Sequence, residues 1–149
     1  MTITVRAARP DDYDTIVSVV DDWWGRPMAR MLPRLFLDHF HATSLVAEQD
    51  GEVVGFLIGF HSASAPDRAY VHFVSVTPAL RGTGLARRLY ETFFAAAVQD
   101  GCKTITAITS PINTRSVAFH KAMGFAVHGP VADYDGPGVA RIVFERQLA

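Results

Sequence analysis

The order of apolar and polar residues in the first third of the chain predicts one strand followed by two helices. Residues 3–7 alternate as a half-buried strand does, and the acidic turn at residues 10–12 opens a segment with apolar residues at helical spacing. Residues 27–42 repeat that spacing, and Pro33 predicts a break inside them, because proline lacks the backbone N–H that a helix interior needs. The apolar residues that recur at helical spacing in these two segments are Tyr13, Ile16, Val17, Val20, Met28, Met31, Leu32, Leu35 and Phe36.

Two apolar runs around the dipeptide Asp50-Gly51 predict a β-hairpin. An Asp-Gly step between apolar runs favours the tight turn that joins neighbouring antiparallel strands. A polar loop at residues 61–67 separates the hairpin from a further strand. The strands expected in this region cover residues 44–48, 53–60 and 70–76.

The second half of the chain predicts two helices and three strands. A long amphipathic helix begins at Leu85, and a second helix follows Asn113. The apolar stripe of the first of these helices consists of Leu85, Leu89, Phe93 and Ala96 or Ala97. The expected strands cover residues 103–109, 125–128 and 139–145, with a loop rich in Gly, Pro and Asp at residues 129–138.

Length and composition indicate one ordinary globular domain, residues 1–149. The net charge of −1 provides no basic surface for nucleic acid. The longest apolar run, residues 93–98, is far shorter than the roughly 18 residues of a membrane-spanning helix, and the N-terminus lacks a signal-peptide pattern. Cys102 is the single cysteine, so no internal disulfide can form, and such a cysteine usually packs as a small apolar residue. These features predict a cytoplasmic protein that binds neither nucleic acid nor membranes.

Residues 81–86, which read Arg-Gly-Thr-Gly-Leu-Ala, lie between the predicted strand 70–76 and the helix that begins at Leu85. At the start of a helix the backbone N–H groups have no intrahelical partners, and the helix dipole places partial positive charge there. Glycines keep side chains away from an anion that approaches the backbone. The segment therefore predicts a site for a phosphorylated ligand that is held mainly by the main chain.

Two common phosphate-binding loops do not fit this segment. The dinucleotide fingerprint requires Gly or Ala at the position of Arg87, where a large side chain would prevent close packing of helix and strand. The nucleoside-triphosphate loop requires Gly-Lys followed by Ser or Thr, and the sequence contains no such string. The pattern that remains is Arg-x-x-Gly-x-Ala.

This hexapeptide, preceded by residues 74–78 and followed by an amphipathic helix, resembles the acyl-coenzyme A pyrophosphate loop of the GNAT superfamily of N-acetyltransferases. Residues 110–125, an Asn-initiated helix that ends in Gly124-Phe125, look like the second signature of that family. The resemblance implies an α/β (α+β) fold, the GNAT acyl-CoA N-acyltransferase fold. This fold is a mixed, mostly antiparallel seven-stranded sheet, flanked by about four helices and splayed between strands 4 and 5 to hold coenzyme A.

The resemblance also implies acetyl-CoA as the cofactor. Its pyrophosphate is expected at the loop, and backbone amides of the preceding strand are expected to contact the pantetheine arm and the thioester oxygen. Arg87, Arg88 and Arg115 are candidates for phosphate contacts, the alternative being that they are ordinary surface arginines. The residues expected to bind the cofactor are Val74, Ser75, Val76, Arg81, Gly82, Thr83, Gly84, Leu85, Ala86, Arg87, Asn113 and Ser116.

Most members of the family carry a tyrosine on the second signature helix that protonates the leaving thiol, and this chain has His120 at that position. By helical spacing, His120 shares a face with Asn113 and Ser116 and could donate a proton instead. The alternative is that His120 only packs or hydrogen-bonds the coenzyme.

Acetyl transfer to an alkylamine also requires a base, because such an amine has a pKa near 10. The strand 70–76 carries no Asp or Glu, and His72 in its middle has a side chain that titrates near neutral pH. By two-residue alternation, His72 shares a face with Tyr70, Val74 and Val76. We therefore expect His72 to act as the base, the alternative being a half-buried strand histidine with a satisfied hydrogen bond.

Carboxylates lie beside aromatic residues at the end of the first helix and in the last loop. Such pairs suit a cationic amine through charge and cation–π attraction, although tryptophans often belong to the core and loop carboxylates are usually solvated. His39 and His41 are two residues apart on a helix, so their rings point apart and no metal site is expected. The residues expected to bind the acceptor are Asp22, Trp23, Trp24, Tyr134 and Asp135.

Together these features predict an N-acetyltransferase that passes acetyl from acetyl-CoA to the primary amine of a small molecule or peptide, by direct attack in a ternary complex. An acyl-CoA-binding regulatory module without turnover is the alternative, suggested by His120 in place of tyrosine. Protein N-terminal acetylation is a third interpretation. Members of the family often form dimers, so a homodimer is consistent with the resemblance.

Overall fold

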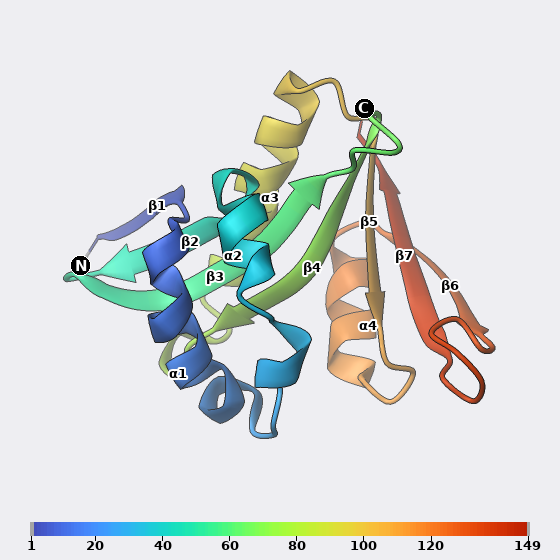
Figure 1. Ribbon diagram of the computed structural model, residues 1–149, viewed down its shortest axis with the longest axis horizontal. Coiled ribbons are helices and arrows are strands. Elements are labelled where there is room, and N and C mark those ends of the chain that lie inside the picture. The colour runs from blue at the N-terminus through green and yellow to red at the C-terminus, as the bar shows by residue number, and fades with distance from the viewer. Residues whose placement is uncertain (1, 149) are drawn as a thin grey trace. The chain divides into compact units, whose positions relative to one another are not determined.

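The computed structural model describes residues 2–148, in which strands and helices follow the predicted order (Figure 1). The strands are β1 (Ile3–Ala7), β2 (Leu45–Gln49), β3 (Glu52–His61), β4 (Arg68–Val76), β5 (Thr104–Thr109), β6 (Ala126–Val131) and β7 (Arg141–Gln147). The α-helices are α1 (Tyr13–Trp24), α2 (Leu35–Phe40), α3 (Leu85–Gln99) and α4 (Thr114–Ala122). Short 3-10 helices are η1 (Pro10–Asp12), η2 (Ala29–Met31), η3 (His41–Thr43) and η4 (Pro78–Leu80).

A seven-stranded sheet has the strand order β1-β2-β3-β4-β5-β7-β6. The pairs β1–β2, β2–β3, β5–β7 and β6–β7 are antiparallel, whereas β4 and β5 are parallel. This arrangement confirms the mixed, mostly antiparallel sheet predicted from the sequence. The chain divides into two compact units, residues 2–60 with 71–96 and residues 61–70 with 97–148, so one boundary falls inside β4.

In the first unit, α1 and α2 lie on one face of the sheet and α3 lies on the other (Figure 1). Apolar side chains at helical spacing on α1 and α2 close the first face, as predicted. The core on this face includes Ile16, Val20, Leu32, Leu37, Val46, Phe56, Ile58 and Phe73. Of the predicted stripe, α3 buries Leu85, Leu89, Phe93 and Ala97, and it also buries Tyr90 and Phe94.

The second predicted helix differs most from its prediction. Pro33 separates η2 from α2, as expected of a residue without a backbone N–H, and η3 follows α2 directly. The break changes the helical phase, and Met31 and Leu35 of the periodic set are 46% and 48% exposed. Leu37, which was not predicted to face the core, is fully buried.

The hairpin predicted around Asp50-Gly51 is formed by β2 and β3. Asp50 and Gly51 have φ values of 53° and 80°, the left-handed values that a two-residue type I′ turn requires. The two strands pair antiparallel, with Gln49 opposite Glu52 next to the turn. The Asp-Gly signal therefore located both the turn and the strand pairing correctly.

Gly55 on β3 lies where α3 approaches the sheet. A Cβ atom at this position would lie 3.3 Å from Cδ2 of Leu85 and 3.4 Å from the carbonyl oxygen of Ser75. These distances are shorter than ordinary contacts of a Cβ atom. The missing side chain therefore lets the first turn of α3 pack closely on β3.

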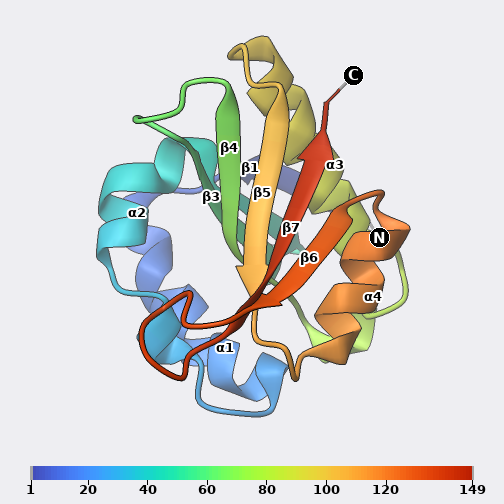
Figure 2. The ribbon, with the colours of Figure 1, turned by 90° about the vertical axis from the view of Figure 1, so that its right-hand side faces the viewer.

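In the second unit, α4 lies beside β6 and β7 (Figure 2). Phe125, which follows α4, and Phe144 on β7 are buried together with Ile105 on β5. The first residues of β4 belong to this unit, and the hydroxyl of Thr106 on β5 donates to the carbonyl of Ala69 at 3.4 Å. This hydrogen bond joins the first part of β4 to β5 within the second unit.

Asp12 is a buried carboxylate at the start of α1. Its oxygens accept hydrogen bonds from Nη1 and Nη2 of Arg6 at 2.9 and 2.8 Å, and Oδ2 also accepts the backbone N–H of Arg9 at 2.7 Å. Nε of Arg6 in addition donates to Glu48 at 2.7 Å. These donors, above all the Arg6 guanidinium, hold the pKa of the Asp12 carboxyl below its usual value, so the ionised form stabilises the fold.

Replacing Asp12 by asparagine should lower the free energy of unfolding at pH 7 by about 2 kcal/mol, because Arg6 would lose its charged partner. The folded-state pKa of Asp12 lies below the unfolded value of about 3.9, so the stabilisation is present above that value and is lost as the pH falls through the folded-state pKa. Urea unfolding of wild type and Asp12→Asn across the acid range measures this. Asp11→Asn is the control, because its side chain is 87% exposed and pairs with Arg9 only at 3.9 Å. A stability difference for Asp12→Asn that does not shrink in acid would contradict the account.

Candidate active site

The predicted phosphate loop is a turn with two glycines that leads from η4 into α3. Gly82 and Gly84 have φ values of 78° and 87°, which other residues rarely adopt. The N–H of Arg88 donates to the carbonyl of Gly84 at 3.0 Å and begins the helical hydrogen bonds. The N–H groups of residues 85–87 precede those bonds and point out of the helix N-terminus. This geometry suits an anion held by the main chain, as predicted.

Side chains of the loop make contacts within the first unit. Nη2 of Arg81 donates to the carbonyl of Trp23 at the end of α1, and the hydroxyl of Thr83 donates to the carbonyl of Leu80 at 2.6 Å. Nη1 of Arg88 donates to a carbonyl of β1 at 2.8 Å. The side chains of Arg81 and Thr83 therefore brace the loop, and that of Arg88 attaches α3 to β1.

Alternate residues of β4 face opposite sides of the sheet. The buried positions are Ala69, Val71, Phe73 and Ser75, and the half-buried positions are Tyr70, His72, Val74 and Val76. His72 therefore lies on the half-buried face with the residues predicted for it. Ser75, one of the predicted cofactor residues, has its side chain on the buried face.

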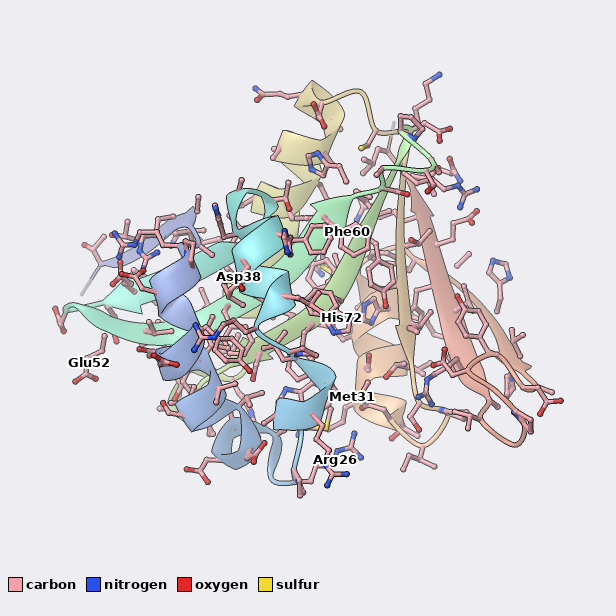
Figure 3. All side chains as sticks on the ribbon, viewed as in Figure 1. Arg26, Met31, Asp38, Glu52, Phe60 and His72 are labelled. Carbon is pink, nitrogen blue, oxygen red and sulfur yellow. The ribbon has the colours of Figure 1, made fainter. Side chains whose placement is uncertain are left out.

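Figure 3 labels His72 on β4 and Met31 on the segment before α2. The ring of His72 is held on two sides, by the ring of Phe36 and by the carbonyl of Met31. It stacks on Phe36 with ring centroids 4.0 Å apart and planes 4° apart, and Nε2 lies 2.5 Å from the carbonyl oxygen of Met31. A carbonyl oxygen only accepts, so we assign the proton to Nε2, and Nδ1 is then the basic nitrogen. Burial lowers the pKa of His72, which keeps the ring neutral at pH 7. The base role of His72 stays a prediction, and a neutral ring is compatible with it.

The two tryptophans at the end of α1 have different surroundings. Trp23 is buried and stacks on Phe56 with ring centroids 6.0 Å apart, so the core alternative fits it. Trp24 is half-buried against an aromatic residue of β4, and the guanidinium of Arg26 lies 5.5 Å from the centroid of its ring. Trp24 thus already has a cation of the protein over its ring, and the neighbouring Asp22 is exposed.

Asn113 caps α4, in agreement with the Asn-initiated helix of the second signature. Its Oδ1 accepts the N–H of Ser116 at 3.2 Å, and its Nδ2 donates to the hydroxyl of Thr109 at 3.2 Å. The side chain of Asn113 therefore has a structural role of its own. The cofactor roles of Asn113 and Ser116 stay predictions.

His120 lies in the aromatic core of the second unit. Its ring stacks on Phe144 with centroids 4.0 Å apart and planes 4° apart, and it meets Phe119 and Phe125 edge to face. Its Nδ1 lies 2.8 Å from the carbonyl of Ser116, so we assign the proton to Nδ1. Burial lowers the pKa of His120 to about 4, and a ring that is neutral at pH 7 is a poor proton donor to a thiolate. The packing alternative therefore fits His120 better than the acid role.

The loop between β6 and β7 carries a charged pair. Oδ2 of Asp135 lies 2.8 Å from Nε of Arg141, so the charge of this predicted acceptor residue is balanced within the loop. Tyr134 is 48% exposed. Burial raises the pKa of Tyr70 to about 12, so its hydroxyl is neutral at pH 7. Tyr134 and Asp135 contribute smaller effects to this pKa, which places the Tyr70 hydroxyl near them. The sequence analysis did not include Arg141 or Tyr70 among the site residues, although Tyr70 was placed on the face of His72.

Three further kinds of feature bear on function in the part of the chain that the structure describes: a metal site, a membrane-spanning helix and the cysteine. Residues 2–148 contain no group of three or more His, Cys, Asp or Glu side chains that could hold a metal ion. In the same range, every helix is too short or too polar to cross a membrane. Cys102 is buried, as predicted, and burial raises the pKa of its thiol.

Proteins of known name match parts of this chain. The L-2,4-diaminobutyric acid acetyltransferase of Nocardia farcinica is 34% identical over 89 residues, which cover 60% of this chain and 46% of that protein. The protein of the same name from Chromohalobacter salexigens is 28% identical over 147 residues, covering 83% of this chain and 77% of that protein. The chain thus spans less than half of the first relative and about three quarters of the second.

A solved structure and a family model extend the comparison. The diaminobutyrate acetyltransferase of Paenibacillus lautus, in complex with L-2,4-diaminobutyric acid and coenzyme A, has a TM-score of 0.76 at 21% identity, covering 97% of this chain and 93% of that chain. This likeness confirms the fold predicted from the two signatures. The model of the acetyltransferase (GNAT) family matches residues 8–125, which include the loop at residues 81–86 and the helix that Asn113 begins. The chain therefore belongs to the acetyltransferase (GNAT) family.

Proposed function

We propose that the protein transfers the acetyl group of acetyl-CoA to the primary amine of a small molecule, by direct attack of the amine in a ternary complex. The observation that carries this proposal is the turn before α3, where two left-handed glycines precede the outward N–H groups of residues 85–87. Such a turn suits a pyrophosphate, and it occurs in a chain of the acetyltransferase family. When bound, acetyl-CoA supplies the thioester whose acetyl carbon the amine attacks.

The main chain of the loop would hold the pyrophosphate. The side chains of Arg81 and Thr83 bond to carbonyls of the protein, so these residues would act through the shape of the loop. The contacting groups would then be N–H groups at the start of α3, those of residues 85–87, because the N–H of Thr83 donates to the carbonyl of Leu80. In the second unit, we retain Asn113 and Ser116 as proposed cofactor residues.

Backbone amides of β4 would stabilise the oxyanion that forms from the thioester. The N–H of Thr77 donates to the carbonyl of Val54 on β3 at 2.9 Å. Because backbone N–H groups alternate between the two edges of a strand, those of Val74 and Val76 are directed to the opposite edge. Donors fixed in a strand need little reorganisation as negative charge develops.

His72 would remove the proton from the acceptor ammonium. Its neutral ring carries the basic lone pair on Nδ1, because Nε2 donates to the Met31 carbonyl. A thiol has an unperturbed pKa near 8.5, so the coenzyme can leave as a thiolate without a proton from His120. One protein base is then sufficient for the reaction.

The names of the relatives support a small amino acid with a side-chain amine as the acceptor. In the first unit, the exposed carboxylate of Asp22 and the ring of Trp24 suit a cationic amine. In the second unit, Tyr134 and Asp135 remain proposed acceptor residues, and the pairing of Asp135 with Arg141 offers the two charges that complement an amino acid. Trp23 would support Trp24 from the core.

An acyl-CoA-binding regulatory module is a second candidate. The burial of a neutral His120, at the position where most family members carry a tyrosine acid, favours it. Both functions use the same loop, so only turnover separates them. A cytoplasmic location remains part of the proposal, and the single cysteine, the buried Cys102, supports it. A homodimer also remains part of the proposal, and the family resemblance supports it.

Free thiol should appear when the purified protein receives acetyl-CoA and an amine acceptor. We expect L-2,4-diaminobutyric acid to be among the best acceptors in a panel with ornithine, lysine and a peptide with a free N-terminus. A thiol reagent gives the rate, and mass spectrometry identifies the acetylated amine. The matched control is 2-aminobutyric acid, which lacks the second amine. Cofactor binding without thiol release for any amine would favour the regulatory module.

Gly84→Glu should abolish cofactor binding, because a carboxylate would stand where the pyrophosphate is expected. Acetyl-CoA at 100 times its Kd should stabilise the wild type by roughly 2.7 kcal/mol, and this gain should vanish in the variant. Thermal unfolding with and without the cofactor measures the difference.

Gly101→Glu is the matched control for Gly84→Glu. Gly101 has a φ of 88°, nearly that of Gly84, and neither glycine would bring a Cβ atom within 4 Å of other described atoms. Both variants therefore carry a similar backbone strain of about 1–2 kcal/mol. A Gly84→Glu protein that keeps the cofactor stabilisation would place the ligand elsewhere.

His72→Gln should lower kcat by about 100-fold while leaving the KM for acetyl-CoA unchanged, because the amide cannot take up a proton. Burial lowers the pKa of His72 below the usual value of about 6.5, so the wild-type ring is an active base at pH 7 and loses activity as the pH falls through the lowered pKa. The pH dependence of kcat should therefore show an acid limb that the variant lacks. An unchanged limb in His72→Gln would assign the base to another group.

A further inference from the structure

Asp21 holds the turn that follows α1. Its Oδ1 accepts the backbone N–H groups of Met28 at 2.7 Å and of Ala29 at 2.9 Å. Gly25, with a φ of 74°, ends α1 and donates its N–H to the carbonyl of Asp21 at 2.8 Å. Asp21 therefore binds the main chain on both sides of the connection between α1 and η2.

The other end of η2 is anchored in the core. Leu32 is fully buried, and its N–H donates to the carbonyl of Ala29 at 3.0 Å. Met31 lies between the part held by Asp21 and the buried Leu32, so both ends fix the direction of its carbonyl. The side chain of Met31 is 46% exposed, and its carbonyl is the group that reaches His72.

The ring of His72 is thereby constrained in two ways. Phe36 stacks on the ring and fixes its plane, and the Met31 carbonyl fixes its rotation within that plane. Released from this carbonyl, the ring could exchange its proton between Nε2 and Nδ1. The lone pair that accepts the proton would then lie on either ring nitrogen instead of only on Nδ1. A small misplacement of a catalytic group lowers the reaction rate.

We propose that Asp21 is a positioning residue for proton abstraction, which holds η2 so that the Met31 carbonyl keeps the proton of His72 on Nε2 and leaves Nδ1 to accept the proton of the acceptor ammonium. This inference rests on the proposed base role of His72. In the step, an N–H bond of the ammonium breaks, an Nδ1–H bond forms, and the electron pair stays on the amine nitrogen. The proton passes to solvent after acetyl transfer.

Asp21 and its neighbour Asp22 therefore have different tasks. Oδ1 of Asp21 accepts two backbone N–H groups, so we assign this oxygen to the turn that positions the Met31 carbonyl. Asp22 is the carboxylate of this pair that we propose for the acceptor amine. The turn requires an oxygen at position 21 that accepts hydrogen bonds, and it does not require the negative charge of Asp21.

The first experiment observes the proton on His72 directly, without catalysis. In protein with nitrogen-15-labelled histidine, near neutral pH, the signal of His72 is identified by its loss in His72→Gln. We expect a protonated Nε2 and an unprotonated Nδ1 in the wild type. A proton on Nδ1, or an even mixture of the two forms, would overturn the proposal whatever the activity of the enzyme.

The second experiment compares Asp21→Ala with Asp21→Asn. Alanine removes the oxygen, so the His72 signal should shift to a mixture of both forms and kcat should fall by about tenfold, with the KM for acetyl-CoA unchanged. Asparagine keeps an oxygen that can accept both N–H groups, so the signal and kcat should stay within about twofold of the wild type. Thermal unfolding of both variants shows that each is folded.

The outcomes separate this inference from the proposed function. A fall in kcat for Asp21→Ala without a change in the His72 signal indicates a merely structural role and overturns the inference. A loss in Asp21→Asn as large as in Asp21→Ala assigns the effect to charge and also overturns it. A wild-type protein with the expected His72 signal but no turnover of any amine would refute the proposed function, while the link between Asp21 and His72 would still be seen in the variant spectra.

Discussion

The alternation of side chains along β4 is the constraint on which both the core and the proposed chemistry depend. One set of alternate residues closes the core of the sheet, and the other set, which includes His72, is only half-buried. Because a strand has a period of two, a shift of one residue would move His72 into the core and Phe73 out of it. The burial of Phe73 against Phe56 and Trp24 therefore also holds His72 on the face where it meets Phe36 and the Met31 carbonyl.

The proposed site relies on the main chain more than on charged side chains. Arginine and threonine side chains of the loop before α3 bond to carbonyls of the protein, and the N–H groups at the start of α3 are directed outward. The histidine of α4 is likewise committed to an aromatic stack. A site of this kind changes little when surface charges change, because backbone donors and the helix dipole carry the attraction. Its sensitivity lies in the turn geometry at Gly82 and Gly84.

Features that depend on a few neighbouring residues were predictable from the sequence. The Asp50-Gly51 turn, the break at Pro33 and the cap at Asn113 are of this kind, since each is decided within one turn of chain. Features that depend on distant segments were not. The Arg81 guanidinium bonds a carbonyl 58 residues away, and the burial that lowers the pKa of His120 on α4 includes its stack on Phe144 of β7. The role proposed for Asp21 depends on the path of the turn to residues 28 and 29, which the single sequence does not specify.

Gly55 limits how this protein can be made more heat-resistant. Exchanging glycine for alanine inside a regular element is a common stabilising substitution, because it restricts the unfolded chain. At this position the added methyl group would press on Leu85, the first residue of α3. The Leu85 side chain would have to move by a few tenths of an ångström at the start of the helix that follows the proposed phosphate loop, so variants at position 55 should be screened for cofactor affinity as well as for heat resistance.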